Sequence, residues 1–163
     1  MRQAVGQIVD VKQRREDTAQ DAVRRCRVLL EEAARRLDRA REELERYTHW
    51  RPGEEARLWD GIMGQLIRID DIDALKAEIG LLRGKEHLLG ERVDEAERVR
   101  AAAHKAVLDA QAAYDAAVKA RQKFEELAEV LDAEWRQEME RREELELEEL
   151  AGTRVMDIEE RLE

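Results

Sequence analysis

Residues 75–145 read LKAEIGLLRGKEHLLGERVDEAERVRAAAHKAVLDAQAAYDAAVKARQKFEELAEVLDAEWRQEMERREEL. Alternating steps of four and three residues from Leu75 reach twenty-one positions, of which sixteen are apolar, and no proline interrupts the run. A repeat that averages 3.5 residues keeps one narrow apolar stripe facing a single partner helix, as in a coiled coil. The stretch therefore predicts one long helix that pairs with one other helix.

A second stripe of the same kind runs through residues 4–50. Its members are Ala19, Ala22, Cys26, Leu29, Ala33, Leu37, Ala40, Leu44 and Tyr47. The stripe that it faces includes Leu75, Ile79, Leu82, Val93, Val107, Tyr114, Phe124 and Leu131. Two consecutive steps of four, at Leu29, Ala33 and Leu37, predict a local unwinding of the supercoil. We interpret Cys26 as a small packed apolar residue rather than as a reactive thiol.

The composition favours long helices over a compact core. Charged residues make up 43% of the chain, aromatic residues 4%, and Pro52 is the only proline. Disorder is the alternative for so charged a sequence, but the sustained repeat and the many good helix formers argue against it. A helix over residues 71–150 would be about 120 Å long, too long for the remaining residues to wrap. We therefore expect an elongated all-α protein.

The one strong break in the helical pattern is Trp50-Arg51-Pro52-Gly53. Proline disfavours helix at the residue before it, and glycine loosens the segment that follows. After the bend, one of Asp70, Asp71 and Asp73 should cap the second helix by accepting hydrogen bonds from free backbone N–H groups. Metal binding by these three carboxylates is the alternative, but the spacing of a helix cap already explains them.

The sequence thus predicts a single antiparallel two-helix coiled-coil hairpin over residues 1–163. Its parts are a first helix over residues 4–50, a bend over 51–70 with a short helix over 54–67, a second helix over 71–150, and a tail over 151–163 after a helix stop at Ala151-Gly152-Thr153. In the predicted register the numbers of paired residues add up to about 139, which sets Leu44 near Ala96.

The net charge of −10 is unevenly distributed along the chain. Residues 1–50 carry +2, residues 51–120 carry −3 and residues 121–163 carry −9. Antiparallel pairing places the more basic first helix beside the acidic end of the second. Exposed ion pairs contribute only about 0–1 kcal/mol each, so this complementarity favours the pairing modestly.

The sequence predicts no catalytic residue, cofactor site or metal site. His49, His87 and His104 are far apart on a helical rod, and none of them has metal-ligand spacing to another. A two-helix rod also lacks a pocket that would desolvate a general acid or base. Nucleic acid is not an expected partner, because no basic stripe is present and the net charge is −10.

The cysteine content and the hydropathy of the sequence indicate the cellular compartment. Cys26 is the only cysteine, so no disulfide can form within the chain and a reducing compartment is natural. The sequence has no run of eighteen apolar residues and no signal peptide, which predicts no direct insertion into a membrane.

Four stretches, taken in order, resemble a known family. They are residues 57–64 (RLWDGIMG) with the following Asp71-Ile72-Asp73, residues 81–86 (LLRGKE), residues 123–127 (KFEEL) and residues 143–150 (EELELEEL). Their order and spacing over about residues 45–150 are similar to the YscO family of type III secretion proteins, also called SctO stalk proteins, which are relatives of flagellar FliJ. The chain departs from the family pattern at Trp59, where tyrosine is expected, at Gly84 in a usually charged run, and at Leu150, where phenylalanine is common.

The resemblance implies a cytoplasmic helical hairpin that is peripheral to the inner-membrane secretion apparatus and similar to the central shaft of rotary ATPases. Its paired ends would enter the hexameric secretion ATPase and stimulate it, and its bend would point to the cytoplasmic domain of the export gate. When free, it would be a monomer that binds secretion chaperones. The residues that would face the ATPase are Arg14, Arg15, Arg24, Arg25, Phe124, Leu145, Leu147 and Leu150. Those that would face the gate or chaperones are Leu58, Trp59, Ile62, Leu82 and Arg83.

Two other functions fit the same sequence. The first is a generic coiled-coil scaffold or tether that forms a homodimer through its long helix. The second is a chaperone-like clamp whose hairpin grips a client protein. The mass of the protein in solution separates the first of these from the stalk, because the stalk requires a monomer.

Overall fold

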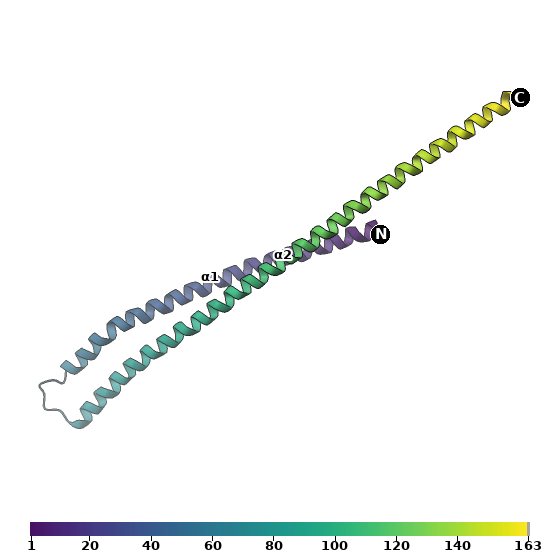
Figure 1. The fold of residues 1–163 in the computed structure, drawn as a ribbon. Helices are drawn as coiled ribbons and strands as arrows, with labels where there is room; N and C mark the ends of the chain where they lie inside the picture. Colours follow the sequence, from purple (N-terminus) through teal and green to yellow (C-terminus); the bar gives the residue numbers. More distant parts are fainter. Residues whose placement is uncertain (163) are drawn as a thin grey trace. The chain divides into compact units, whose positions relative to one another are not determined.

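The computed structural model describes residues 1–162 and contains two helices (Figure 1). Helix α1 spans Arg2–Asp60 and helix α2 spans Ile69–Leu162, and residues 61–68 join them. The described residues include no β-strand, and the two helices pack against each other. The predicted all-α helical hairpin is therefore confirmed.

The chain divides into two units, and each unit contains a segment of both helices. Unit 1 comprises Met1–Ala19 and Ala113–Glu163. Glu163, the last residue of the predicted tail, lies outside the described residues. Unit 2 comprises Gln20–Ala112 and includes the bend. Each unit is a two-helix pair with its own apolar seam.

In α2 the seam follows the predicted repeat. All apolar positions of that repeat from Leu75 to Leu131 are buried or half-buried. Leu75, Ile79, Leu89 and Val93, all in unit 2, are the most deeply buried. Steps of four and three residues therefore predicted the buried face of this helix correctly.

In α1 the seam lies one residue away from the predicted stripe at two points. Leu29 is 57% exposed, whereas Leu30 is half-buried between Cys26 and Ala33. Ala22, Leu37 and Leu44 are buried or half-buried, as predicted. Val23, which is 5% exposed, is also more deeply buried than Ala22. With Val23 and Leu30 in place of Ala22 and Leu29, steps of four and three alternate without interruption from Ala19 to Tyr47, so a single stripe faces α2 and the predicted unwinding is wrong.

The register of unit 2 is visible in its cross-helix pairs. Arg27 Nη2 donates to Gln111 Oε1 at 3.3 Å, and Arg41 Nη2 donates to Glu97 Oε1 at 3.2 Å. The numbers of both pairs add up to 138, within one residue of the prediction. A sum of 138 sets Leu44 near Asp94, two residues from the predicted Ala96, and Leu44 and Asp94 line the same surface hollow.

Helix α1 continues through Pro52 to Asp60, so the predicted break at Trp50–Gly53 is wrong. Residues 54–60 belong to α1, and residues 61–67 are not helical, so the predicted separate helix over 54–67 is wrong too. A proline inside a helix costs about 3 kcal/mol. The residues around it supply contacts that offset this cost: Arg51 pairs with Glu86 of α2 across the interface and with Glu55, one turn further along α1, at 2.9 Å.

A turn and a helix cap shape the connection between the helices. Gly64 has a positive φ of 84°, which glycine adopts without strain, and it lies in a turn closed by a hydrogen bond from Gln65 N to Ile62 O. At the start of α2, the backbone N–H of Arg68 donates to Asp71 Oδ2 at 3.2 Å. Asp71 therefore caps α2 as predicted for one of the three aspartates, but it does so from the third helical position, as in a capping box.

Helix α2 also continues beyond its predicted end. Ala151-Gly152-Thr153 lie inside the helix, and the described residues of the predicted tail are helical up to Leu162. The hydroxyl of Thr153 donates to the carbonyl of Glu149 at 2.8 Å, within the helix. One glycine costs a helix only about 1 kcal/mol, which the good helix formers on both sides outweigh.

Candidate interaction surfaces

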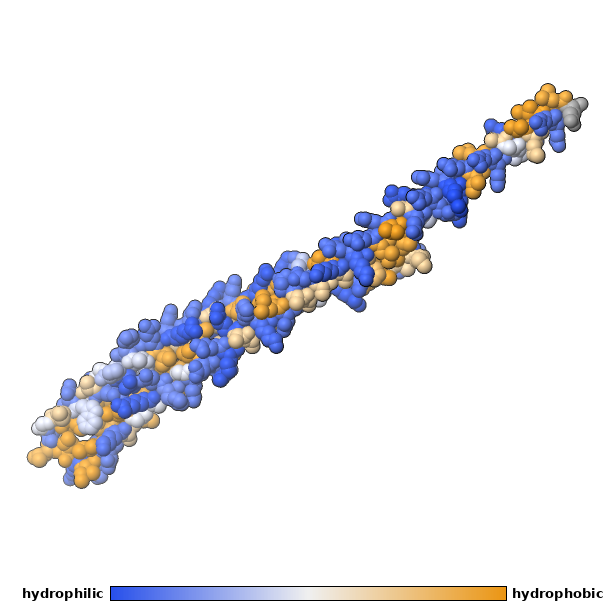
Figure 2. All heavy atoms as spheres, viewed as in Figure 1, coloured by the Kyte–Doolittle hydropathy of each residue, from blue (hydrophilic) through white to orange (hydrophobic). Residues whose placement is uncertain are grey.

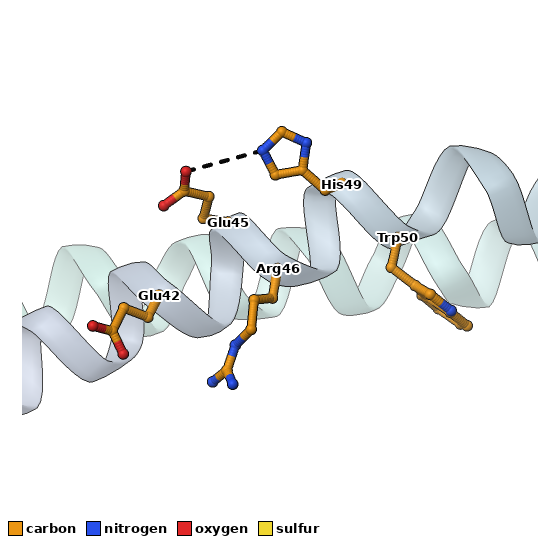
Figure 3. A pocket seen from close by; sticks show the side chains of 5 residues that line it. All are labelled: Glu42, Glu45, Arg46, His49 and Trp50. Atoms are coloured by element: carbon orange, nitrogen blue, oxygen red, sulfur yellow. Dashed lines mark ion pairs between the residues drawn. The ribbon is translucent and has the colours of Figure 1, made fainter.

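Side chains gather on the surface of the helices in hollows rather than in a site enclosed by several elements. Figure 3 shows one hollow, whose lining residues Glu42, Glu45, Arg46, His49 and Trp50 all come from successive turns of α1. The His49 ring lies 3.9 Å from the Glu45 carboxylate, an ion pair when His49 is protonated. Such a hollow beside one helix can contact a partner, but it does not desolvate a reacting group.

The described residues hold no candidate metal site and no candidate membrane-spanning helix. Among residues 1–162, no three His, Cys, Asp or Glu side chains come together in a group that could hold a metal ion. Neither α1 nor α2 contains a segment apolar and long enough to cross a membrane.

The bend of unit 2 carries an exposed apolar surface, here called the bend surface. Its members are Trp59, Met63, Leu66, Ile67 and Ile69. Figure 2 shows apolar residues gathered at this end of the hairpin, where the connection joins α1 to α2. Large apolar side chains that remain in water at one place are typical of a protein-binding surface.

The predicted gate-facing residues differ in their availability. Trp59 is 40% exposed, and Leu58 and Ile62 are half-buried beside it. Leu82 lies in the seam, where its carbonyl accepts a hydrogen bond from Tyr47 Oη at 2.7 Å. Arg83 is held by Glu55 through two hydrogen bonds, of 3.0 and 3.3 Å. The structure therefore brings Leu58, Trp59 and Ile62 together, leaves Leu82 to the packing of the hairpin, and keeps Arg83 exposed at the surface beside Glu55.

Arg83 belongs to an ionic cluster that includes Arg51, Glu55 and Glu86. Glu86 and then Glu55 accept hydrogen bonds from Arg51, which raises the pKa of its guanidinium. The hydrogen bonds from Arg83 and, to a lesser extent, from Arg51 lower the pKa of Glu55. These shifts favour the charged forms of Arg51 and Glu55 at neutral pH, and the cluster ties α1 to α2 beside the bend.

Unit 1 contains a similar ionic cluster, in which one arginine pairs with a glutamate of each helix. Arg121 of α2 pairs with Glu16 of α1 and with Glu125, four residues further along its own helix, at 2.7 Å. The hydrogen bonds that Arg121 donates to Glu16 first, and then to Glu125, raise the pKa of its guanidinium. Sequence reasoning placed Glu86 and Arg121 on the stripe but did not find their partners. The only signal was an arginine followed four residues later by a glutamate, at 51 and 55 and again at 121 and 125.

The predicted ATPase-facing residues fall in both units. In unit 1, Arg14 and Arg15 are exposed, and Phe124 is half-buried under Lys12, whose Nζ lies 5.2 Å from the ring centre. Arg2 pairs with Asp132 at 2.5 Å and lies over the ring of Trp135. The predicted residues further along α2, Leu145, Leu147 and Leu150, are all exposed.

The remaining two predicted arginines, Arg24 and Arg25, belong to unit 2 and are exposed. Arg24 lies 3.7 Å from Asp21, one turn earlier in α1. Both arginines point into solvent rather than into the seam, so they are available to an acidic partner.

The two paired helices define this chain as an all-α helical-hairpin protein. The family described as type III secretion protein YscO matches residues 5–153, which is most of the chain. The chain therefore belongs to the YscO family of type III secretion proteins, and the resemblance seen in the sequence is confirmed.

A solved structure supports the same assignment. The crystal structure of type III secretion protein YscO from Vibrio parahaemolyticus, at 2.8 Å, is similar with a TM-score of 0.87 and 28% sequence identity. The similarity covers 91% of this chain and 93% of that chain. No protein in the curated set matches the chain significantly.

Proposed function

We propose that this protein is the central stalk component of a type III secretion system. It links the hexameric secretion ATPase to the cytoplasmic domain of the export gate and stimulates the ATPase without being an enzyme itself. The observation that carries the proposal is family membership together with two exposed apolar surfaces, one in each unit. A linker between two machines needs at least two such surfaces.

The ATPase would bind unit 1, and Arg24 and Arg25 of unit 2 would add to its contact. Arg14 and Arg15 offer positive charge, while α2 beyond residue 138 offers negative charge and exposed leucines. The two charge types on neighbouring helices can meet different subunits of a hexamer. Since these charges are exposed, the interaction should weaken as salt rises.

The export gate or a secretion chaperone would bind the bend surface. Trp59 and its neighbours Leu58 and Ile62 supply an aromatic and aliphatic anchor of the kind that dominates protein interfaces. The protein would then be located in the cytoplasm, peripheral to the inner-membrane secretion apparatus.

The packing favours the stalk over a scaffold that dimerises through its long helix. The stripe of α2 from Leu75 to Leu131 is covered by the chain's own α1. A second copy would have to displace α1 in order to use that stripe. We therefore propose a monomer when the protein is free.

The test is ATP turnover by the cognate hexameric ATPase with and without the purified chain. The chain alone should not hydrolyse ATP, and the wild type should raise the turnover of the ATPase. A variant with Arg14, Arg15, Arg24 and Arg25 changed to Glu should stimulate less while keeping its helicity. Light scattering on the same samples should give the mass of one chain. A folded wild type that neither binds nor stimulates the ATPase would reject the stalk and leave the scaffold.

A further inference from the structure

The seam of unit 1 is less apolar and less buried than the seam of unit 2. In unit 1 the α1 side of the seam keeps the steps of four and three and consists of Val5, Val9, Lys12, Glu16 and Ala19. Of these, only Val5 is buried, and two are charged. Among the described residues of α2 in unit 1, which run from 113 to 162, none is buried. The other buried apolar residues all lie in unit 2, so burial stabilises unit 1 much less.

Two basic residues of α1 contact acidic and aromatic residues of α2 in unit 1. Arg2 pairs with Asp132 at 2.5 Å, and its guanidinium lies 4.4 Å from the centre of the Trp135 ring. Lys12 lies over the ring of Phe124. The side chains of Arg2 and Asp132 are 52% and 40% exposed, so water competes for this ion pair. Exposed contacts of this kind are weak singly, and ion pairs among them weaken further as salt rises.

The third charged contact in unit 1 is the pair of Glu16 and Arg121. Their side chains are 12% and 19% exposed, so this pair is better shielded from water than the pair of Arg2. Both residues occupy seam positions, where an apolar residue would normally pack against the partner helix. Charged contacts thus take the place of apolar packing between the start of α1 and α2.

The start of α1 also has a weak intrinsic preference for helix. Most of residues 5–11 are glycine or β-branched: Val5, Gly6, Ile8, Val9 and Val11. Such residues favour a helix less than alanine, leucine or glutamate do. The first turn of α1 contains no acidic residue, so it lacks the negative charge that stabilises the N-terminal end of a helix. A helical segment this short is marginal in water without packing, so residues 2–19 should unfold once their contacts with α2 break.

We infer that residues 2–19 are a strap, held to α2 by charged contacts, that opens and unfolds while unit 2 stays folded. Opening uncovers an apolar face of α2 that lies at seam positions and consists of Phe124, Ala128, Leu131 and Trp135. Because charged contacts hold the strap, ionic strength sets how often this face is exposed. Local opening of a weakly packed end needs less free energy than global unfolding. The inference goes beyond the proposed function and depends on neither the ATPase nor the export gate.

Hydrogen exchange of backbone amides, measured by mass spectrometry on the full chain, tests the strap directly. The first amides of any helix lack partners, so residues 6–19 are compared with residues 23–47 of the same helix. Residues 6–19 should exchange about tenfold faster or more. Raising the salt from about 50 mM to about 500 mM should speed their exchange more than that of residues 23–47. Equal exchange in the two segments, or a strap that does not respond to salt, would overturn the inference.

Two substitutions should shift the opening of the strap in opposite directions. Glu16→Gln removes the charge of the shielded pair and should raise strap exchange about tenfold or more. Gly6→Ala should lower strap exchange about fivefold, because alanine favours helix and a Cβ added at Gly6 meets no atom within 4 Å. A strap whose exchange Gly6→Ala does not slow would contradict an opening that unfolds the helix.

The matched controls make the same chemical changes in unit 2. Glu86→Gln removes the cross-helix partner of Arg51, and Gly53→Ala fills an equally open position of α1. Both controls should leave strap exchange within about twofold of the wild type, since the strap opens separately from unit 2. If the controls change strap exchange as much as the strap variants do, the hairpin opens as one body and the inference fails.

The uncovered face can be followed through Trp135. Trp50 and Trp59 are the other two tryptophans of the chain, so replacing both by phenylalanine leaves Trp135 as the single tryptophan. As urea rises, its fluorescence should change at a lower concentration than the helicity measured by circular dichroism, and Glu16→Gln should widen that gap. Coincident changes in fluorescence and helicity would mean that only global unfolding uncovers this face, which would overturn the inference.

Discussion

The phenolic oxygen of Tyr47 donates a hydrogen bond to the backbone carbonyl of Leu82 at 2.7 Å. Tyr47 is buried in the seam of α1, and Leu82 is half-buried in the seam of α2. The carbonyl of a helical residue already serves the ladder of its own helix, so the hydroxyl adds a second bond across the interface. A buried phenol without such a partner would be costly.

Replacing Tyr47 by phenylalanine should remove that bond and leave the ring packing nearly intact. We expect the free energy of unfolding to fall by about 1 kcal/mol. Urea denaturation followed by circular dichroism measures this change. An unchanged midpoint would mean that water satisfies both groups equally well in the unfolded chain.

Deprotonation of Tyr47 should lower the stability of the protein at high pH. Burial is the largest cause that raises the pKa of Tyr47 above its ordinary value of 10.0. Because the unfolded chain loses this proton first, the advantage of the wild type over Tyr47→Phe is fully present below about pH 10 and is lost as pH rises through the higher folded pKa. Urea denaturation of both proteins between pH 8 and pH 11 measures the difference, and a constant difference would contradict the prediction.

Protonation of the ionic cluster beside the bend should lower the stability of the protein at low pH. Arg83 first, and then Arg51, lower the pKa of Glu55 below its ordinary value of 4.5. The stability that this carboxylate contributes is therefore present above that value and is lost as pH falls through the lowered folded pKa. Glu55→Gln should have a lower melting temperature than the wild type at pH 7, and the two should converge toward pH 3. Glu45→Gln, in an exposed pair with His49, is the control and should change the melting temperature little at either pH.

The position of the α1 seam predicts a large loss of stability when Leu37 is replaced and a small one when Leu29 is replaced. Leu37→Ala removes a side chain that is 2% exposed and should lower the free energy of unfolding by about 2–4 kcal/mol. Leu29→Ala removes one that is mostly in water and should change it by less than about 0.5 kcal/mol. Thermal melts of both variants decide between this seam and the one that the sequence alone suggested. Equal losses would restore Leu29 to the seam.

The bend surface should matter for secretion but not for the ATPase. Trp59→Ala should reduce export of a secretion substrate into the culture medium, since the proposed anchor of the gate contact is lost. Trp50→Ala is the matched control, because Trp50 is also an exposed tryptophan of α1 but lies outside the bend surface. Loss of ATPase stimulation by Trp59→Ala, with export unchanged, would assign the bend to the ATPase instead.

The heptad repeat was enough to predict the two helices, their antiparallel pairing and most of the seam, because the period of the pattern directly sets which face is buried. The predicted seam of α1 was wrong by one residue at Leu29. Leu29 and Leu30 have the same side chain, and only the contact with α2 distinguishes them. The bend was misjudged for a different reason. Local rules at Pro52 favoured a break, but contacts of Arg51 with α2 supply tertiary stabilisation that no local rule includes.

The candidate surfaces were predictable to a lesser degree. Trp59 and the leucines of residues 143–150 stood out in the sequence because they are apolar residues off the seam or beyond its partner. The roles of Leu82 and Arg83 could not be foreseen, because the partners that occupy them, Tyr47 and Glu55, are close only after folding.

The two arginine clusters have a consequence for how this chain can change in length. Glu16 and Arg51 are 35 residues apart in α1, and their partners Arg121 and Glu86 are also 35 residues apart in α2, five heptads in each case. Deleting one heptad from α1 between them would preserve the apolar stripe, yet it would separate one arginine from its cross-helix glutamate. Only a matching deletion in α2 restores both pairs. Insertions and deletions in this family member should therefore be tolerated between the clusters only as compensating pairs, one in each helix, while the connection over residues 61–68 can vary alone.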